Sequence, residues 1–181
     1  MALGATIYTF AVQLSDVDRG VYESLTFKAA QHPSETGEFF VTRVLAYCLE
    51  YREGIAFSRG LGDPDEPPLF VRDLTGTMMV WIDIGGPDGP RLHKASKATP
   101  RVVIYTHKDP DRLVRQLEGE RIHRREAIEV RAVDRELIDQ IVQRLDRRMT
   151  FDLSVSDGHL YVTIAGDTLE GAVERFALAA S

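Results

Sequence analysis

The feature that most constrains the fold is the segment MMVWIDIG, residues 78–85, which is built like a strand but has no polar face. Side chains alternate along a strand, and both alternating sets are apolar here except at Asp83. A strand of this kind is covered on both sides, as in a sheet with helices on its faces. A carboxylate in that position costs free energy unless a metal ion, a basic partner, hydrogen-bond donors or a solvated cleft compensates it.

Length, composition and cysteine content define the class of protein. The 181 residues, 44% apolar and 28% charged, are typical of one globular domain over residues 1–181. No apolar run approaches the roughly 20 residues that span a bilayer, so we expect no membrane association. Cys48 is the only cysteine, which excludes an intrachain disulfide. The first residues do not resemble a secretory signal, and together these features favour the cytoplasm of a bacterial cell.

Local patterns predict a mixed sheet with helices on its faces, flanked by hairpins. Strands over 4–14 and 21–30 should form an antiparallel hairpin, and Ser34 should cap the helix that follows. The Asp-Gly pair at 157–158 marks the turn of a second hairpin. A weak helix is expected near 168–177. Between the hairpins, the predicted order of elements is helix, strand, strand, strand, helix, strand.

Acidic residues should converge at one end of the central sheet. The strand LFVRD, residues 69–73, is joined to the strand 78–85 by a short turn, so the two should pair antiparallel. The start of the first strand then lies beside the end of the second. Because neighbouring strands are about 4.8 Å apart, Asp65 and Glu66 can approach Asp83 there.

Such a cluster suits a divalent cation. Mg²⁺ is commonly held by one or two carboxylates together with waters and substrate phosphates. Lys94, in the first turns of the helix that follows Asp83, could return to this end of the sheet. There it would orient a water molecule or stabilise developing negative charge. Asp73 falls near the other end of the strand pair and should not take part.

Four segments give the chain a resemblance to a known family. They are HPSETGE (32–38), FSRGLGDPDEP (57–67), WIDIGGPDGPRLHKA (81–95) and RRMTFDLSVSDG (147–158). In order and over essentially the whole chain, they resemble the YaeQ family of bacterial proteins. That family is described as a variant of the PD-(D/E)xK nuclease fold. The resemblance implies an α/β (α+β) protein, in which a mixed sheet has a restriction-endonuclease-like core of order αβββαβ with flanking hairpins.

The resemblance also implies roles for the acidic residues. Asp65 or Glu66 takes the first acidic position of the motif and Asp83 the second, as ligands of Mg²⁺ or Mn²⁺. Glu38 or Glu35, from the first helix, would be the extra acid that many such enzymes carry. Glu38 has the better geometry, because it shares a helix face with core residues three and seven positions later.

The motif lysine is missing. Its position is occupied by Gly85, which has no side chain. Lys94, or with less support Lys97, could supply the amine from the following helix. Asp83 could instead be a buried carboxylate paired with an arginine such as Arg59, because structural ion pairs perturb carboxylates as active sites do.

Two functions are therefore open. The first is a Mg²⁺- or Mn²⁺-dependent nuclease-like phosphodiesterase that acts on nucleic acid, which the converging acids favour. The alternative is a noncatalytic binding or regulatory protein that retains the nuclease-like fold. The net charge of −6 and the glycine at position 85 favour the alternative. Strong nonspecific binding to nucleic acid needs clustered Lys and Arg, although a local basic groove is compatible with this charge.

Overall fold

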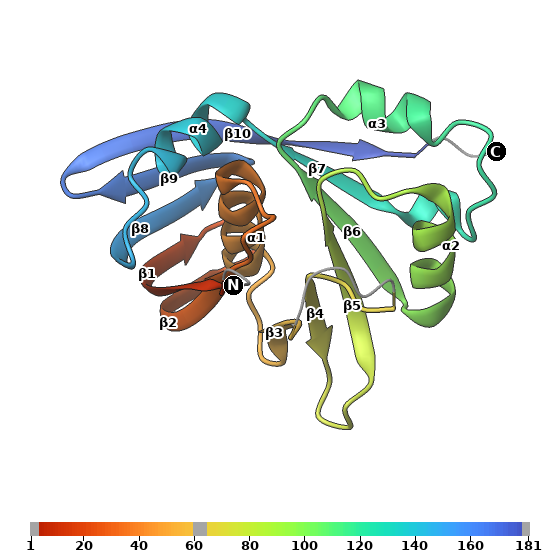
Figure 1. Cartoon of the computed structure of the whole chain (residues 1–181), viewed down its shortest axis with the longest axis horizontal. Helices are drawn as coiled ribbons and strands as arrows, with labels where there is room; N and C mark the ends of the chain where they lie inside the picture. The colour runs from red at the N-terminus through yellow and green to blue at the C-terminus, as the bar shows by residue number, and fades with distance from the viewer. Residues whose placement is uncertain (1–3, 60–64, 179–181) are drawn as a thin grey trace. The chain divides into compact units, whose positions relative to one another are not determined.

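The computed structural model describes residues 4–59 and 65–178 (Figure 1). In this part of the chain it has ten β-strands and four α-helices, so the expected mixed α+β class is confirmed. No helix among these residues is long and apolar enough to cross a membrane. The chain forms two compact units, Met1–Val44 with Val133–Glu174 and Leu45–Ala132 with Arg175–Ser181. Whether the whole chain is one domain stays a prediction.

The first unit contains five strands in the order β2-β1-β8-β9-β10. Their bounds are β1 Thr6–Asp16, β2 Val21–Gln31, β8 Arg148–Ser156, β9 His159–Ile164 and β10 Asp167–Ala177, the last of which ends in the second unit. β1 and β2 pair antiparallel, and β1 runs parallel to β8. The expected second hairpin joins β8 to β9 through Asp157 and Gly158, which have positive φ angles of 51° and 70°. Both predicted hairpins are therefore confirmed.

Two helices belong wholly or partly to this unit, α1 (Gly37–Leu49) and α4 (Arg135–Val142). The prediction that Ser34 caps α1 is wrong. The helix begins later, and the hydroxyl of Thr36 accepts a hydrogen bond from the backbone N–H of Phe39 at 3.1 Å. In an N-cap, a side-chain oxygen accepts a hydrogen bond from the backbone N–H three residues later, and Thr36 has this geometry. Ser34 instead contacts the ring of His32 at 2.7 Å.

The weak helix expected near 168–177 is also wrong, because these residues form strand β10. Ala165 and Gly166 have φ angles of 50° and 87°, which turn the chain back so that Asp167 pairs with Ile164 of β9. Leu169 and Gly171, two residues apart, are buried, which is the period of a strand. Pairing with β9 thus outweighs a weak local preference for helix.

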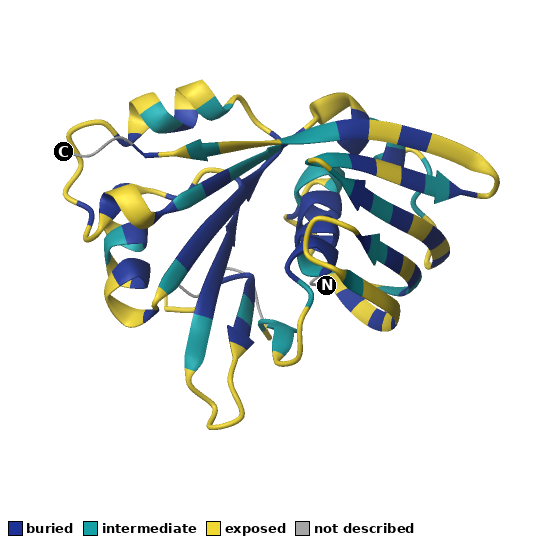
Figure 2. Cartoon of the chain, turned by 180° about the vertical axis from the view of Figure 1, so that it is seen from behind, coloured by how far each residue is buried: buried dark blue, intermediate teal, exposed yellow. Residues whose placement is uncertain are grey.

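The second unit contains strands in the order β7-β6-β5-β4-β3. Their bounds are β3 Ile55–Phe57, β4 Leu69–Arg72, β5 Met78–Ile84, β6 Arg101–Thr106 and β7 Glu129–Val133. Helices α2 (Gly89–Ala98) and α3 (Pro110–Gln116) contribute Leu92 and Leu113 to a core cluster with Trp81 and Ile104. Figure 2 shows β5 and β6 buried along most of their length. The expectation that the strand 78–85 is covered on both faces is confirmed.

Strand register determines where Asp83 lies. β4 and β5 pair antiparallel with Leu69 opposite Ile82, so Asp83 lies just beyond the start of β4. β6 lies parallel on the other side of β5, with Ile104 opposite Asp83. Asp73 lies at the other end of the β4–β5 pair, where its carboxylate accepts hydrogen bonds from the backbone N–H groups of the turn. The antiparallel arrangement predicted for these two strands is confirmed.

Candidate functional site

Asp83 is the buried centre of the candidate site. It is 3% exposed, and its Oδ2 atom accepts two hydrogen bonds. The indole N–H of Trp81, two residues earlier on the same face of β5, donates at 3.0 Å. The Nε–H of Arg91 donates at 2.8 Å. A basic partner and a second donor therefore compensate the carboxylate, and the arginine in this ion pair is Arg91 rather than Arg59.

Arg91 connects three elements of the second unit. It lies in the first turn of α2, where the cap residue Asp88 accepts a hydrogen bond from the Arg91 backbone N–H at 2.9 Å. Its Nη2 atom donates to the main-chain carbonyl of Glu66 at 3.0 Å. Its guanidinium lies 5.3 Å from the centroid of the Trp81 ring. One side chain thus joins the end of β5, the segment before β4 and the start of α2.

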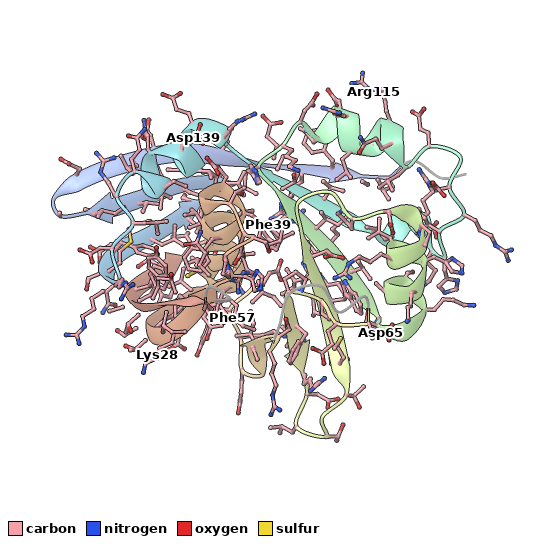
Figure 3. The ribbon with its side chains drawn as sticks, viewed as in Figure 1. Lys28, Phe39, Phe57, Asp65, Arg115 and Asp139 are labelled. Carbon is pink, nitrogen blue, oxygen red and sulfur yellow. The ribbon has the colours of Figure 1, made fainter. Side chains whose placement is uncertain are left out.

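Lys94 lies about one turn further along α2 and forms an ion pair with Asp65. Figure 3 labels Asp65. The two side chains are 59% and 63% exposed, so water screens this pair much more than the pair at Asp83. Glu66 is exposed, and the contact it makes with Arg91 comes from its main-chain carbonyl. The structure thus gathers the four predicted residues of this unit around the first turns of α2, while Pro64 lies outside the described residues.

The oxygen atoms around Arg91 are of the type that binds a hard cation, but they are too few to form a metal site. Within 4–59 and 65–178, no group of three or more His, Cys, Asp and Glu side chains is placed to hold a metal ion. However, a carboxylate oxygen of Asp83 and the carbonyl oxygen of Glu66 both bind one positive group, the guanidinium of Arg91. Carboxylate and carbonyl oxygens are the ligands of Mg²⁺ and Mn²⁺ in proteins, with waters and phosphates completing the shell.

Glu35 and Glu38 belong to the first unit. Glu35 is 9% exposed, and both of its carboxylate oxygens accept hydrogen bonds from Arg43, at 2.9 and 3.0 Å. Arg43 also donates to the carbonyl of Ala30 at 2.7 Å, so this ion pair fastens the end of β2 to α1. Glu38 is half-buried in the first turn of α1. The assisting role of either acid stays a prediction.

The second unit also contains a charged network that the sequence pattern does not predict. Glu50 accepts hydrogen bonds from Arg101 at 2.6 Å and from the hydroxyl of Tyr105 at 2.7 Å. Glu129 binds Arg101 at 2.6 Å and Arg131 at 2.5 Å. Its members come from the end of α1, from β6 and from β7, so no local spacing marks them as a group.

The network changes the proton affinity of two members. Burial, together with the negative charge of Glu50, raises the pKa of Tyr105 well above its ordinary value. Burial by itself lowers the pKa of Arg101, but the hydrogen bonds to Glu50 and Glu129 outweigh it and raise that pKa. The arginine therefore stays charged and the phenol stays neutral, which is the state in which every hydrogen bond of the network is satisfied.

Comparison with known proteins gives a consistent result. A family model described as YaeQ protein matches residues 1–173. Relatives named Uncharacterized protein YaeQ, from Salmonella typhi and Escherichia coli (strain K12), are each 30% identical over 171 residues, 94% of this chain and 94% of theirs. The crystal structure of YaeQ protein from Pseudomonas syringae has a TM-score of 0.85 and 31% identity, covering 96% of both chains. That from Xanthomonas axonopodis pv. citri has a TM-score of 0.82 and 28% identity, covering 97% of this chain and 99% of its own.

Proposed function

This chain belongs to the YaeQ family, and from the residues around α2 we propose that it is a divalent-cation-dependent phosphodiesterase that acts on nucleic acid. The observation that carries the proposal is that two oxygen atoms, one from Asp83 and one from Glu66, bind the same positively charged group, the guanidinium of Arg91. The element order from α1 to β6, αβββαβ, supports a PD-(D/E)xK-like core as part of the same proposal.

The carboxylates of Asp83 and of Asp65 or Glu66 would hold Mg²⁺ or Mn²⁺, together with the Glu66 carbonyl. When bound, such an ion activates a water molecule and stabilises negative charge on a phosphodiester. Lys94, exposed and next to Asp65, would contribute positive charge toward the phosphate. The assisting acid would be Glu38, as the family resemblance implies. Glu35 is the weaker choice, because Arg43 already binds both of its oxygens.

The backbone at Gly85 gives a physical reason for a lysine on α2. Gly85 has a φ of 85°, in the left-handed region that favours glycine. A lysine there, at the usual motif position, would be strained by roughly 1–2 kcal/mol. The chain turns sharply at this point into α2, and α2 carries both Arg91 and Lys94 back toward Asp83 and Asp65. Positive charge near the acids is therefore supplied by the helix rather than by the strand.

The test is cleavage of single- and double-stranded DNA and RNA by the full chain with Mn²⁺ or Mg²⁺. We expect cleavage that a chelator abolishes, and that Asp83→Asn and Lys94→Ala each slow by roughly 100-fold or more. The matched controls are Asp73→Asn, at the other end of the β4–β5 pair, and Lys28→Ala, on β2 (Lys28 is labelled in Figure 3). Both should cleave like the wild type. No cleavage under any of these conditions, or cleavage that Asp83→Asn leaves unchanged, would contradict the proposal.

The second candidate is a noncatalytic binding or regulatory protein that keeps the nuclease-like fold. It is favoured by the burial of Asp83, whose side chain is 4% exposed and already accepts hydrogen bonds from Trp81 and Arg91. In that case the ion pair is permanent and structural. The wild type would then bind no Mn²⁺ in calorimetry and cleave nothing, while Asp83→Asn would lower the melting temperature.

A further inference from the structure

We propose that the outer edge of β2 pairs antiparallel with β2 of a second copy of this chain, with Thr26 on the two-fold axis. The pairing joins the sheets of the first units of the two copies into one continuous sheet. It uses none of the residues around α2, so it stands or falls independently of the proposed phosphodiesterase.

β2 is a long strand at the edge of its sheet. It is the outermost strand in the order β2-β1-β8-β9-β10, and all eleven of its residues pair with β1 without a bulge (Figure 1). Proteins usually protect such an edge by shortening it, or with proline, bulges or charged side chains. β3, the other end of the strand order, has only three residues. β2 has no proline and a single lysine, Lys28, so its edge is open to another strand.

The hydrogen bonds of β1 determine which main-chain groups of β2 face outward. The N–H of Thr9 donates to the carbonyl of Arg147, just before β8, at 2.7 Å. The N–H of Val17, an even number of residues further on, donates to Val155 of β8 at 2.9 Å. Odd-numbered residues of β1 therefore bond toward β8 and even-numbered ones toward β2. The register pairs these even-numbered residues with odd-numbered residues of β2, so the even-numbered residues of β2 face away from β1.

A contact of Arg43 supports this assignment. Its Nη2 atom donates to the main-chain carbonyl of Ala30 at 2.7 Å, from the side away from β1. No other outward N–H or C=O group of β2, from Tyr22 to Ala30, makes a hydrogen bond to a residue that the structure describes. A second strand can therefore pair with this edge without breaking a hydrogen bond of the first.

The full-length register of two copies of β2 is self-complementary. Thr26 is the middle residue of the strand, so an antiparallel pair with complete overlap places Thr26 opposite itself. Ser24 then lies opposite Lys28 of the second copy, and Tyr22 lies opposite Ala30. All of these residues turn their main-chain groups outward, so they meet as hydrogen-bonded pairs. The register also keeps the two lysines apart, whereas one centred on Lys28 would place their like charges opposite each other.

The exposed apolar side chains match the same register. Exposed and buried residues alternate along β2 (Figure 2), and Tyr22 and Ala30 both lie on its exposed face. Tyr22 is 62% exposed, and Ile7, which lies opposite Ala30 on β1, is 53% exposed. Tyr22 of the second copy would be separated from Ile7 only by the small side chain of Ala30. Because neighbouring strands are about 4.8 Å apart, the ring can reach across the alanine, and the two-fold axis makes this contact twice.

Sedimentation velocity of the full-length chain between about 1 and 200 μM tests the proposal. We expect a reversible monomer–dimer equilibrium with a dissociation constant on the order of 10 μM, because pairing of one strand buries a small area. Thr26→Pro removes an outward N–H that the monomer does not use, and should weaken association roughly tenfold or more. Thr26→Val keeps the N–H and should associate like the wild type. A wild type that stays monomeric, whatever else β2 binds, or equal association of Thr26→Pro, overturns the proposal.

A side-chain variant covers the case in which Thr26→Pro does not fold. Tyr22→Ser removes the contact with Ile7 in both halves of the dimer and should weaken association roughly fivefold or more. The matched control is Tyr161→Ser on β9, which is also an exposed tyrosine but lies on an interior strand. It should associate like the wild type. Equal association of Tyr22→Ser and the wild type overturns the proposed register.

Cross-linking locates the axis directly. In a hydrogen-bonded pair the two Cα atoms are about 5.5 Å apart, so a short bismaleimide should join two copies of Thr26→Cys. The control is Thr150→Cys, exposed on β8, which should remain unlinked. Cys48 is buried and does not compete for the reagent. Failure of Thr26→Cys to cross-link, or equal cross-linking at both positions, places the contact elsewhere and overturns the proposal.

Discussion

At the scale of single residues, burial determines how much each ion pair contributes to the stability of the fold. In the pair Asp83–Arg91, the side chain of Asp83 is 4% exposed. In the pair Asp65–Lys94, both side chains are more than half exposed. Removing one partner of a buried pair leaves an uncompensated charge in a poorly hydrated position. Removing one partner of an exposed pair returns the other to water at little cost.

We therefore predict that the same substitution, aspartate to asparagine, destabilises the protein more at position 83 than at position 65. Asp83→Asn should lower the free energy of unfolding by about 2–4 kcal/mol, somewhat less than for a fully enclosed pair because Arg91 is partly exposed. Asp65→Asn should lower it by less than about 1 kcal/mol. Urea unfolding followed by far-UV circular dichroism measures both. Similar losses for the two variants would mean that Asp83 is not held as the structure describes.

Sequence reasoning could find Asp83 but not its partner. The carboxylate stands out because it interrupts an otherwise apolar strand. The partner is one of 22 lysines and arginines, and nothing in the strand pattern distinguishes it. Arg91 is selected by the turn at Gly85 and by the cap at Asp88, which together set the direction in which α2 leaves the sheet. That direction is a property of backbone geometry rather than of residue spacing.

At the scale of elements, polar contacts attach Glu50, the residue that follows α1, to Arg101 and Tyr105 of β6. Tyr105 donates to Glu50, and its phenol is almost wholly buried. Because burial raises its pKa, the phenol ionises in the unfolded chain near pH 10 but only at higher pH in the folded protein. The stability contributed by this group is therefore complete below about pH 10 and is lost as the pH rises toward the folded pKa.

Tyr105→Phe tests this attachment. The variant should lose about 1–2 kcal/mol at neutral pH, because Glu50 loses a donor. Its stability should also fall less steeply than that of the wild type above about pH 10. Urea unfolding at several pH values measures both effects. The control is Tyr22→Phe on β2, whose side chain is exposed, and which should match the wild type at every pH.

A close contact between α4 and β10 gives a second prediction at this scale. A Cβ atom added at Gly171 would lie 2.8 Å from the Cβ of Asp134 and 2.9 Å from that of Leu137. These atoms are next to the backbone and cannot move without moving α4. Gly171→Ala should therefore lower the free energy of unfolding by about 1–3 kcal/mol.

Gly86→Ala is the control for this prediction. Its added Cβ would lie 3.9 Å from a side-chain carbon of Leu113, which is ordinary contact. Chemical denaturation of both variants checks the difference, and equal stability of the two would show that α4 and β10 are less closely packed than described.

Elements were predictable where the information is local. Both hairpins and the antiparallel pair of β4 and β5 follow from turn residues and side-chain period. β10 was missed because its conformation depends on pairing with β9 and on packing of Gly171 against α4, and neither contact is visible in the residues 168–177 themselves.

At the scale of the whole molecule, the two compact units are not separated by linkers. The chain passes from one unit to the other after Val44, after Ala132 and after Glu174. Each of these points lies inside a regular element, namely α1, β7 and β10. Boundaries between independent domains usually fall in exposed, flexible segments. The composition shows no such segment, which is why the sequence predicted one domain and did not reveal the two units.

We therefore expect the chain to unfold in a single cooperative transition. Trp81, the only tryptophan, lies in the core of the second unit, so its fluorescence reports on that unit, whereas far-UV circular dichroism reports on both. The two signals should give coincident urea midpoints. Gly171→Ala, which disturbs the first unit, should shift the Trp81 midpoint as far as the circular dichroism midpoint. If the fluorescence transition stays in place while the circular dichroism transition moves, the units unfold independently and the prediction of one domain is wrong.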